Sequence, residues 1–147
     1  MEVIVKNEEE TKRQARSVLK EMIRKKDKAA SVVALSGELG SGKTVFAKGL
    51  AEALGISERV ISPTFVIERR YETSSPGFPC FIHIDAYRLN SSDDMNTIDW
   101  PQKLKDPDNL ICLEWPENVC SVIPPDSLKI NFEVVSEKKR LLKIFYD

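Results

Sequence analysis

A glycine-rich stretch, GELGSGKT at residues 37–44, is the first group of residues whose types and spacing suggest chemistry. It fits the pattern G-x-x-x-x-G-K-[ST], in which a bent backbone turns several N–H groups toward the phosphates of a nucleotide. Lys43 adds a positive charge for the β- and γ-phosphates, and Thr44 adds a hydroxyl group for Mg²⁺. The stretch predicts a nucleoside triphosphate site whose contacts come from Gly37, Gly40, Ser41, Gly42, Lys43, Thr44 and Val45.

Two carboxylates are placed to manage that magnesium ion. Asp85 ends the segment CFIHID and Glu114 ends NLICLE, so each follows an apolar run that we expect to be a strand. Ligands bind at the carboxyl ends of strands in open α/β sheets, and a phosphate loop needs an acidic residue there for the Mg²⁺ shell. Asp85 and Glu114 are therefore both candidate catalytic residues and metal ligands. One can bind Mg²⁺ while the other orients or deprotonates water, and their spacing does not divide these roles.

Two further side chains lie beside these carboxylates in the sequence. His83, the only histidine, alternates with Ile82 and Ile84, and we interpret it as a strand residue that faces a neighbour. Trp115 directly follows Glu114. We expect this tryptophan in the core or in the wall of the site, and a role in contacting a partner stays open.

The remaining motifs narrow the class of nucleotide-binding protein. A small GTPase needs an N-K-x-D guanine reader, which is absent from the sequence, and Asp85 is followed by AYRL where a D-x-x-G is required. A kinase needs an arginine-bearing lid and a pocket for the phosphoryl acceptor, for which so short a chain has little material. These exclusions favour an ATPase whose energy is used outside the chain.

The predicted elements place this chemistry in an α/β fold. Apolar patterns predict strands at residues 2–5, 31–36, 65–71, 79–84 and 110–113, and a hairpin at 128–135 and 141–146. Helical spacing predicts helices at 8–26 and 43–54, and the polar stretch 93–108 is expected to be a loop with a short helix. This order predicts a P-loop type sheet, parallel in the centre with antiparallel edge strands, and helices on both faces.

Composition sets further limits. The 147 residues, 41% hydrophobic and 31% charged, fit a single domain over residues 1–147. A net charge of −1 argues against tight nucleic-acid binding by this chain alone. The three cysteines show no paired framework or metal-ligand spacing, and neither a signal peptide nor a membrane span is visible. We expect a soluble, cytoplasmic protein with no membrane partner.

Several segments together resemble one family. They are Thr11 within EET, the phosphate loop, SPTF at 62–65, HIDAYRL at 83–89 and LEWPE at 113–117. In this order and at these spacings they are similar to TsaE, the small bacterial ATPase of tRNA threonylcarbamoyladenosine biosynthesis. The similarity covers about residues 8–118. The last three segments are far more specific than the phosphate loop, which many families share.

The resemblance implies roles for individual residues. Thr64 in SPTF would lie in a switch-like loop that senses the γ-phosphate, and Thr11 would lie near the bound nucleotide. Asp85 matches the catalytic-site aspartate of the family, and Glu114 matches the glutamate associated with Mg²⁺. Trp115 matches a tryptophan beside the active site. The implied catalytic residues are thus Lys43, Thr64, Asp85 and Glu114.

The resemblance also implies a mechanism. The protein would bind ATP and Mg²⁺ and dock on the TsaD–TsaB heterodimer, which transfers a threonylcarbamoyl group to an adenosine in the tRNA anticodon loop. Hydrolysis would be weak in the isolated protein, and tRNA would be reached indirectly through the complex. Two alternatives stay open: a stand-alone small-molecule kinase, and a nucleotide-dependent binding module that barely hydrolyses. The presence of Asp85 and Glu114 argues against the second.

Overall fold

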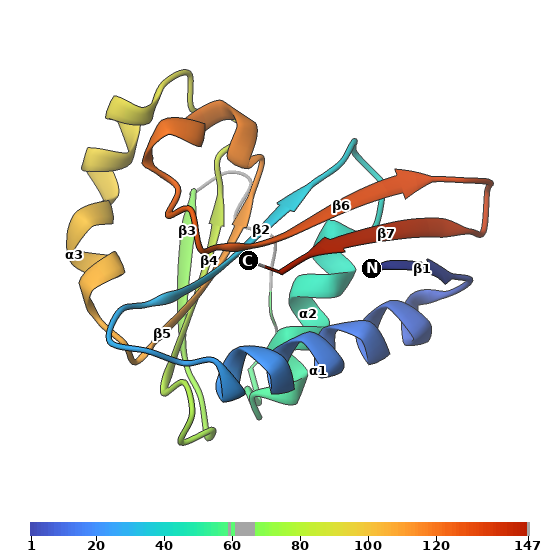
Figure 1. The fold of residues 1–147 in the computed structure, drawn as a ribbon, viewed down its shortest axis with the longest axis horizontal. Helices are drawn as coiled ribbons and strands as arrows, with labels where there is room; N and C mark the ends of the chain where they lie inside the picture. The colour runs from blue at the N-terminus through green and yellow to red at the C-terminus, as the bar shows by residue number, and fades with distance from the viewer. Residues whose placement is uncertain (59, 61–66, 147) are drawn as a thin grey trace.

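The computed structural model of the chain describes residues 1–58, 60 and 67–146, and a seven-stranded sheet runs through this part (Figure 1). The strands are β1 (Glu2–Val5), β2 (Ser31–Ser36), β3 (Glu68–Glu72), β4 (Cys80–Asp85), β5 (Asn109–Glu114), β6 (Leu128–Val134) and β7 (Arg140–Phe145). Their order across the sheet is β1-β7-β6-β2-β5-β4-β3.

The direction of the strands confirms the predicted α/β class. The middle strands β6, β2, β5 and β4 are parallel, whereas β1, β7 and β6 pair antiparallel at one edge and β3 pairs antiparallel with β4 at the other. β5 is buried along its whole length, as expected for a parallel strand covered on both faces. The strand predicted at 65–71 begins at Glu68 among the described residues, and residues 65 and 66 lie outside them.

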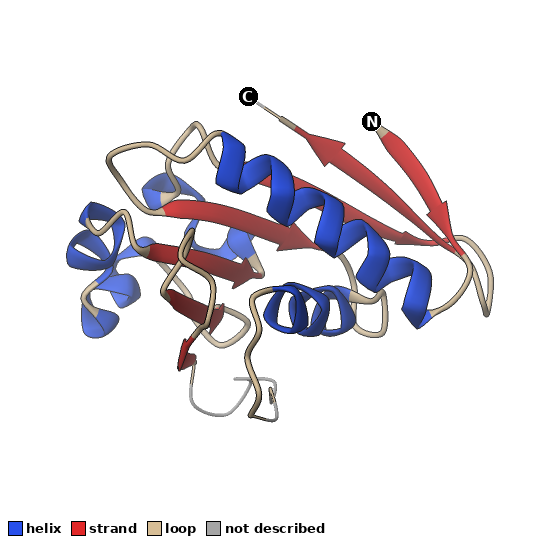
Figure 2. Cartoon of the chain, turned by 90° about the horizontal axis from the view of Figure 1, so that it is seen from below, coloured by secondary structure: helices blue, strands red, loops and turns tan. Residues whose placement is uncertain are grey.

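Two helices cover one face of the sheet and lie side by side (Figure 2). They are α1 (Glu8–Arg24) and α2 (Lys43–Ala53), each within two residues of the predicted bounds. The side chain of Asn7 caps α1 by accepting a hydrogen bond of 2.8 Å from the N–H of Glu10. Three glutamates in the first turn of α1 complement its positive end.

The contact between α1 and α2 depends on a residue without a side chain. A Cβ added at Gly49 would lie only 2.9 Å from the Cα of Lys12 and from the Cβ of Ala15. The same interface carries an ion pair of 2.8 Å between Lys12 Nζ and Glu52 Oε1. Gly49 therefore sets the distance at which the two helices pack.

We expect Gly49→Ala to lower the free energy of unfolding. Overpacking lowers the free energy of unfolding by roughly 1–3 kcal/mol. The higher helix propensity of alanine raises it by ~1 kcal/mol, which offsets only part of that loss over most of this range. Urea unfolding monitored by circular dichroism measures the change. Lys48→Ala, at an exposed position of the same helix, is the matched control and should change stability little. A Gly49→Ala protein more stable than the wild type would contradict the packing argument.

Short helical segments cover the opposite face, which confirms the prediction of helices on both faces. They are the 3₁₀ segment η1 (Ser92–Ile98), the helix α3 (Trp100–Lys105) and the 3₁₀ segment η2 (Pro116–Val122). Residues 93–108 are thus more helical than predicted. The reason is tertiary: Met95 and Trp100 are buried in a second core, which they form with Ile82 and Ile84 of β4 and Ile111 and Leu113 of β5. Trp100 Nε1 also donates a hydrogen bond of 3.0 Å to the carbonyl of Val122.

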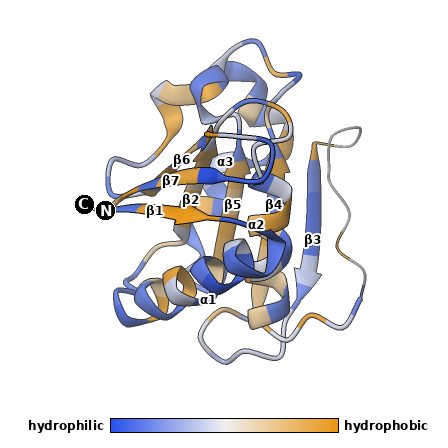
Figure 3. Ribbon diagram, turned by 90° about the vertical axis from the view of Figure 1, so that its right-hand side faces the viewer, coloured by the Kyte–Doolittle hydropathy of each residue, from blue (hydrophilic) through white to orange (hydrophobic). Residues whose placement is uncertain are grey.

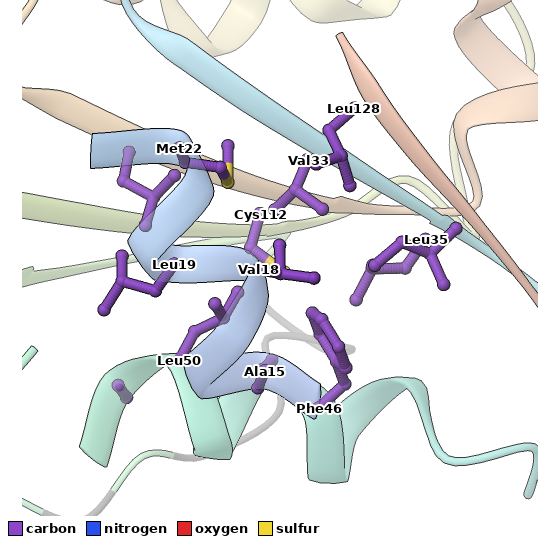
Figure 4. Packing of buried hydrophobic residues seen from close by; sticks show 14 of the residues in the cluster. Ala15, Val18, Leu19, Met22, Val33, Leu35, Phe46, Leu50, Cys112 and Leu128 are labelled. Carbon is purple, nitrogen blue, oxygen red and sulfur yellow. The ribbon is translucent and has the colours of Figure 1, made fainter. Parts of the chain in front are cut away.

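The larger core lies between the sheet and the helices α1 and α2 (Figure 4). Val18 and Leu19 of α1 and Leu50 of α2 pack toward Val33 and other sheet residues, with no more than 5% of these side chains exposed. In Figure 3 the middle strands carry mostly the apolar colour, whereas α1 alternates between apolar and hydrophilic segments. This packing fixes α2, and with it the phosphate loop, against the carboxyl ends of the strands. No helix in the described part of the chain is long and apolar enough to cross a membrane.

Candidate nucleotide-binding site

The glycine-rich loop joins the end of β2 to the start of α2 and adopts a backbone that favours glycine. Gly37 has φ 147° and Gly42 has φ 107°. A Cβ at Gly37 would lie 2.7 Å from the carbonyl oxygen of Phe132 and 2.8 Å from Ser41 Oγ, so a side chain would fill the loop. The N-cap residue of α2 is Gly42, which has no side chain to cap the helix, so the first N–H groups and the positive end of α2 can receive an anion.

Ser41 supplies a direct sign that a ligand belongs in this loop. Its side chain is buried, and its Oγ has no hydrogen-bond partner among the residues that the structure describes. Buried polar atoms normally have a partner, because an unpaired one costs about 1–3 kcal/mol. An anionic group held by the loop would provide that partner.

Lys43, the first residue of α2, is held inside the site. Only 4% of it is exposed; its Nζ donates to the carbonyl of Gly37 and lies 3.6 Å from the centroid of the Trp115 ring. Burial lowers the pKa of Lys43, and nearby carboxylates, foremost Glu114, oppose this shift. The loop thus contains a partly desolvated ammonium group that a phosphate can pair.

Asp85 and Glu114 meet at the carboxyl ends of two neighbouring strands. They are Cα partners in the parallel register of β4 and β5, and both side chains are buried. Together with Lys43, Thr44 and Trp115 they line one cavity of about 320 Å³. The same cavity is also lined by Gly40, Ser41, Gly42 and Val45, whereas Gly37 is not among its lining residues. The structure therefore brings together the predicted metal ligands and all of the predicted phosphate contacts except Gly37.

The backbone around these carboxylates is tightly fixed. The N–H of Asp85 donates a hydrogen bond of 2.8 Å to the carbonyl of Ile67, and Asp85 Oδ1 accepts one of 2.9 Å from the N–H of Tyr87. Trp115 follows Glu114 with φ 61°, an unusual value for an aromatic residue. This turn helps place its ring over Lys43 and 5.1 Å from the ring of Tyr87.

Thr11 lies on the other side of the phosphate loop. It is buried near the start of α1, and its hydroxyl group donates a hydrogen bond of 3.3 Å to the carbonyl of Asn7. Together with Gly40, Gly42 and Val45 it lines a second cavity of about 420 Å³. The two cavities share these loop residues, so a ligand in the loop can extend from one into the other.

Thr64 and the rest of the segment SPTF lie outside the described residues. The predicted role of Thr64 in sensing the γ-phosphate therefore stays a prediction.

Sequence reasoning missed one side chain of the site, Arg140, and the partner of another, Glu114. Arg140, at the start of β7, contacts the carbonyl of Gly40 through Nε at 3.3 Å and Nη2 at 3.2 Å, and it lines the second cavity. No local sequence pattern identifies Arg140 as a residue of the site, because it lies 100 residues after Gly40 in the chain. Glu114 was predicted, but its partner was not: His83 Nε2 lies 2.5 Å from Glu114 Oε2. The prediction that His83 faces a neighbour agrees with this contact.

The donor set suits a hard cation that is shared with a ligand. Within the described ranges, no three histidine, cysteine, aspartate or glutamate side chains are grouped as a metal site. The hydroxyl of Thr44 and the carboxylates of Asp85 and Glu114 offer oxygen atoms, which Mg²⁺ prefers. Mg²⁺ commonly takes one or two carboxylates together with phosphate oxygens, so the residues present fit a magnesium–nucleotide complex.

The sheet, the loop before α2 and the acidic strand ends together define a protein of the P-loop class. A family model described as "Threonylcarbamoyl adenosine biosynthesis protein TsaE" matches residues 5–142 of the chain. The chain belongs to the TsaE family, whose role is in the biosynthesis of threonylcarbamoyladenosine in tRNA.

Individual relatives agree with this assignment. The chain is similar to the tRNA threonylcarbamoyladenosine biosynthesis protein TsaE of Rickettsia felis, with 36% identity over 97% of this chain and 78% of the relative. For the TsaE protein of Mycobacterium tuberculosis the identity is 39%, over 74% of this chain and 67% of the relative. The crystal structure of the Bacillus protein YdiB superposes with a TM-score of 0.72 and 26% identity, over 99% of this chain and 84% of that one.

Proposed function

We propose that the protein is a Mg²⁺-dependent ATPase that binds ATP, hydrolyses it weakly by itself and acts on the TsaD–TsaB complex during threonylcarbamoylation of tRNA. One observation carries the enzymatic part of this proposal. A single cavity is lined by the phosphate loop, by Lys43 and Thr44 at the start of α2, and by the carboxylates of Asp85 and Glu114. This is the set of groups that phosphoryl transfer from a nucleotide requires.

Each side chain then has a task that follows from its position. Lys43 exchanges the carbonyl of Gly37 for the phosphates and stabilises their negative charge. The hydroxyl of Thr44 and one carboxylate hold Mg²⁺, and the other carboxylate orients or deprotonates the attacking water. When bound, ATP and Mg²⁺ supply the phosphoanhydride bond and a Lewis acid that neutralises the phosphate oxygens. Thr64 is proposed to sense the γ-phosphate.

The partner part of the proposal is supported by the surface beside the site. Leu39 in the phosphate loop is 74% exposed, and Tyr87, in contact with Trp115, is 49% exposed. Apolar side chains at the rim of a cavity favour a protein partner that covers them. With a net charge of −1, the chain by itself is not suited to bind tRNA, so we propose that tRNA is reached through the complex.

The experiment that tests the proposal measures ATP hydrolysis by the purified protein, alone and with TsaD–TsaB, each with and without tRNA. We expect slow hydrolysis in isolation and clear stimulation by the heterodimer, together with threonylcarbamoyladenosine in the tRNA detected by mass spectrometry. A mock purification without the protein serves as the control for contaminating ATPases. Rapid hydrolysis that no partner changes would contradict the proposal and favour a kinase with its own small-molecule acceptor.

A further inference from the structure

A buried hydrogen bond joins the only histidine of the chain to one of the two site carboxylates. His83 Nε2 lies 2.5 Å from Glu114 Oε2, and the exposed fractions of the two side chains are 0% and 4%. In the parallel register of β4 and β5, His83 is opposite Cys112, and Asp85 is opposite Glu114. The imidazole therefore lies two residues before Asp85 on the same face of the sheet, directly behind the carboxylates that line the cavity.

The chemistry of the pair sets the direction of this bond. A carboxylate accepts hydrogen bonds, so we assign the tautomer in which the Nε2–H group of His83 donates a hydrogen bond to Glu114 Oε2. The other ring nitrogen, Nδ1, is buried without a hydrogen-bond partner in the part of the chain that the structure describes. Among the described residues, the His83 ring thus forms a hydrogen bond through Nε2 alone, and the partner in that bond is a residue of the site.

Packing does not account for a histidine at this position. Two of the neighbouring positions on this face are buried and apolar: Phe81, whose ring centroid lies 6.3 Å from that of His83, and Cys112 on β5. The other two are Asp85, which lines the cavity, and Arg69 on β3, which is exposed. An apolar residue would fill the same space without a buried, unpaired Nδ1, which is costly. The feature that an apolar residue could not reproduce is the N–H directed at Glu114.

We propose that His83 is a positioning residue that holds the carboxylate of Glu114 in the orientation required beside Thr44. The glutamate side chain has three rotatable bonds, and a hydrogen bond to Oε2 restricts them within the cavity wall. The bond engages one carboxylate oxygen and leaves the other for Mg²⁺ or its bound water. The inference rests on the proposed Mg²⁺-dependent ATPase function, and it assigns His83 no contact with the nucleotide.

Two substitutions of similar size separate positioning from packing. His83→Gln retains an N–H group at about the distance of Nε2, whereas His83→Met has a similar volume and flexibility but no donor. Phe81→Leu perturbs the same strand and face without touching Glu114, so it is the control for a general loss of core packing. His83→Leu also has no donor and replaces His83→Met in the comparison if the Met protein does not fold.

Three measurements are compared: the thermal midpoint of unfolding, the affinity for ADP without Mg²⁺ by calorimetry, and the gain in ATP affinity on adding Mg²⁺. Turnover with TsaD–TsaB is recorded alongside. Residues that orient a metal ligand typically contribute 10–100-fold to metal affinity or activity, so we expect His83→Met to lose roughly that much in the Mg²⁺-dependent gain and in kcat. Its affinity for Mg²⁺-free ADP and its thermal midpoint should stay close to those of His83→Gln, which should retain most of the gain.

The outcomes distinguish this inference from the proposed function. If the wild type hydrolyses ATP with Mg²⁺ and His83→Met matches it, the positioning role is wrong and the proposed function stands. If His83→Gln loses as much as His83→Met, or Phe81→Leu loses the Mg²⁺-dependent gain as well, the role is also wrong. A wild type that neither binds ATP more tightly with Mg²⁺ nor hydrolyses it would overturn both proposals.

Discussion

Replacing Lys43 by alanine is expected to remove nearly all ATP hydrolysis, both in the isolated protein and in the presence of TsaD–TsaB. Lys43 is 4% exposed, and it lines the cavity of the phosphate loop together with both carboxylates. Hydrogen bonds to charged groups contribute about 1.5–3 kcal/mol, so nucleotide affinity should fall by roughly 10–100-fold. Loss of a preorganised donor to the reacting phosphate should lower kcat by about a further 10²–10³-fold. Calorimetry and a phosphate-release assay measure the two effects separately.

Folding stability should not follow activity in this variant. Lys43 is desolvated, and its burial lowers its pKa, so its removal relieves a cost that offsets the lost contacts with Gly37 and Trp115. We expect a thermal midpoint close to that of the wild type. Lys48→Ala removes an exposed positive charge from the same helix and should leave hydrolysis intact. Undiminished hydrolysis in the Lys43→Ala protein would show that the loop is not the nucleotide site.

The sequence was sufficient to predict those parts of the fold and of the site that depend on local pattern and on neighbouring residues. The phosphate loop and α2 follow from the glycine spacing and helical periodicity, and both carboxylates follow from their positions at the ends of apolar strands. These features depend on a few adjacent residues, whose conformational preferences agree with the fold around them. For the same reason the strand bounds differ from the predictions by one residue at most, apart from the start of β3, whose predicted residues 65 and 66 lie outside the described part of the chain.

Features that depend on contacts between distant segments were not predicted. Met95 and Trp100 give the stretch after β4 its helical structure by inserting into the second core, although its own periodicity is weak. Arg140 reaches the phosphate loop because β7 lies near β2 in the sheet, an order that local patterns do not specify. The partner of His83 depends on the pairing of β4 with β5. Strand order is a property of the whole chain, so no single segment encodes these contacts.

Exchange of Glu114 for glutamine should separate nucleotide binding from hydrolysis. Glutamine has the same length, and its carbonyl oxygen can still accept from His83, so the fold and the affinity for Mg²⁺-free ADP should change little. The amide is a poorer Mg²⁺ ligand and cannot act as a base. A positioned acid–base group typically contributes 10²–10⁴-fold, so we expect kcat to fall by at least about 10²-fold. A phosphate-release assay over a range of Mg²⁺ concentrations measures this loss of kcat.

Glu114→Ala and Asp85→Asn complete the test, because they assign the roles that spacing alone leaves undivided. Glu114→Ala also leaves the N–H of His83 unpaired in the interior, which should lower stability by about 1–3 kcal/mol relative to Glu114→Gln. If extra Mg²⁺ restores hydrolysis in one carboxylate variant, the substituted residue is a metal ligand. If extra Mg²⁺ does not restore hydrolysis in the other variant, the residue substituted there acts on the attacking water. Normal hydrolysis by Glu114→Gln would instead make Glu114 a structural partner of His83 and leave the metal to Asp85 and Thr44. The same result would remove the basis for a positioning role of His83, so the site assignment and the further inference both depend on this variant.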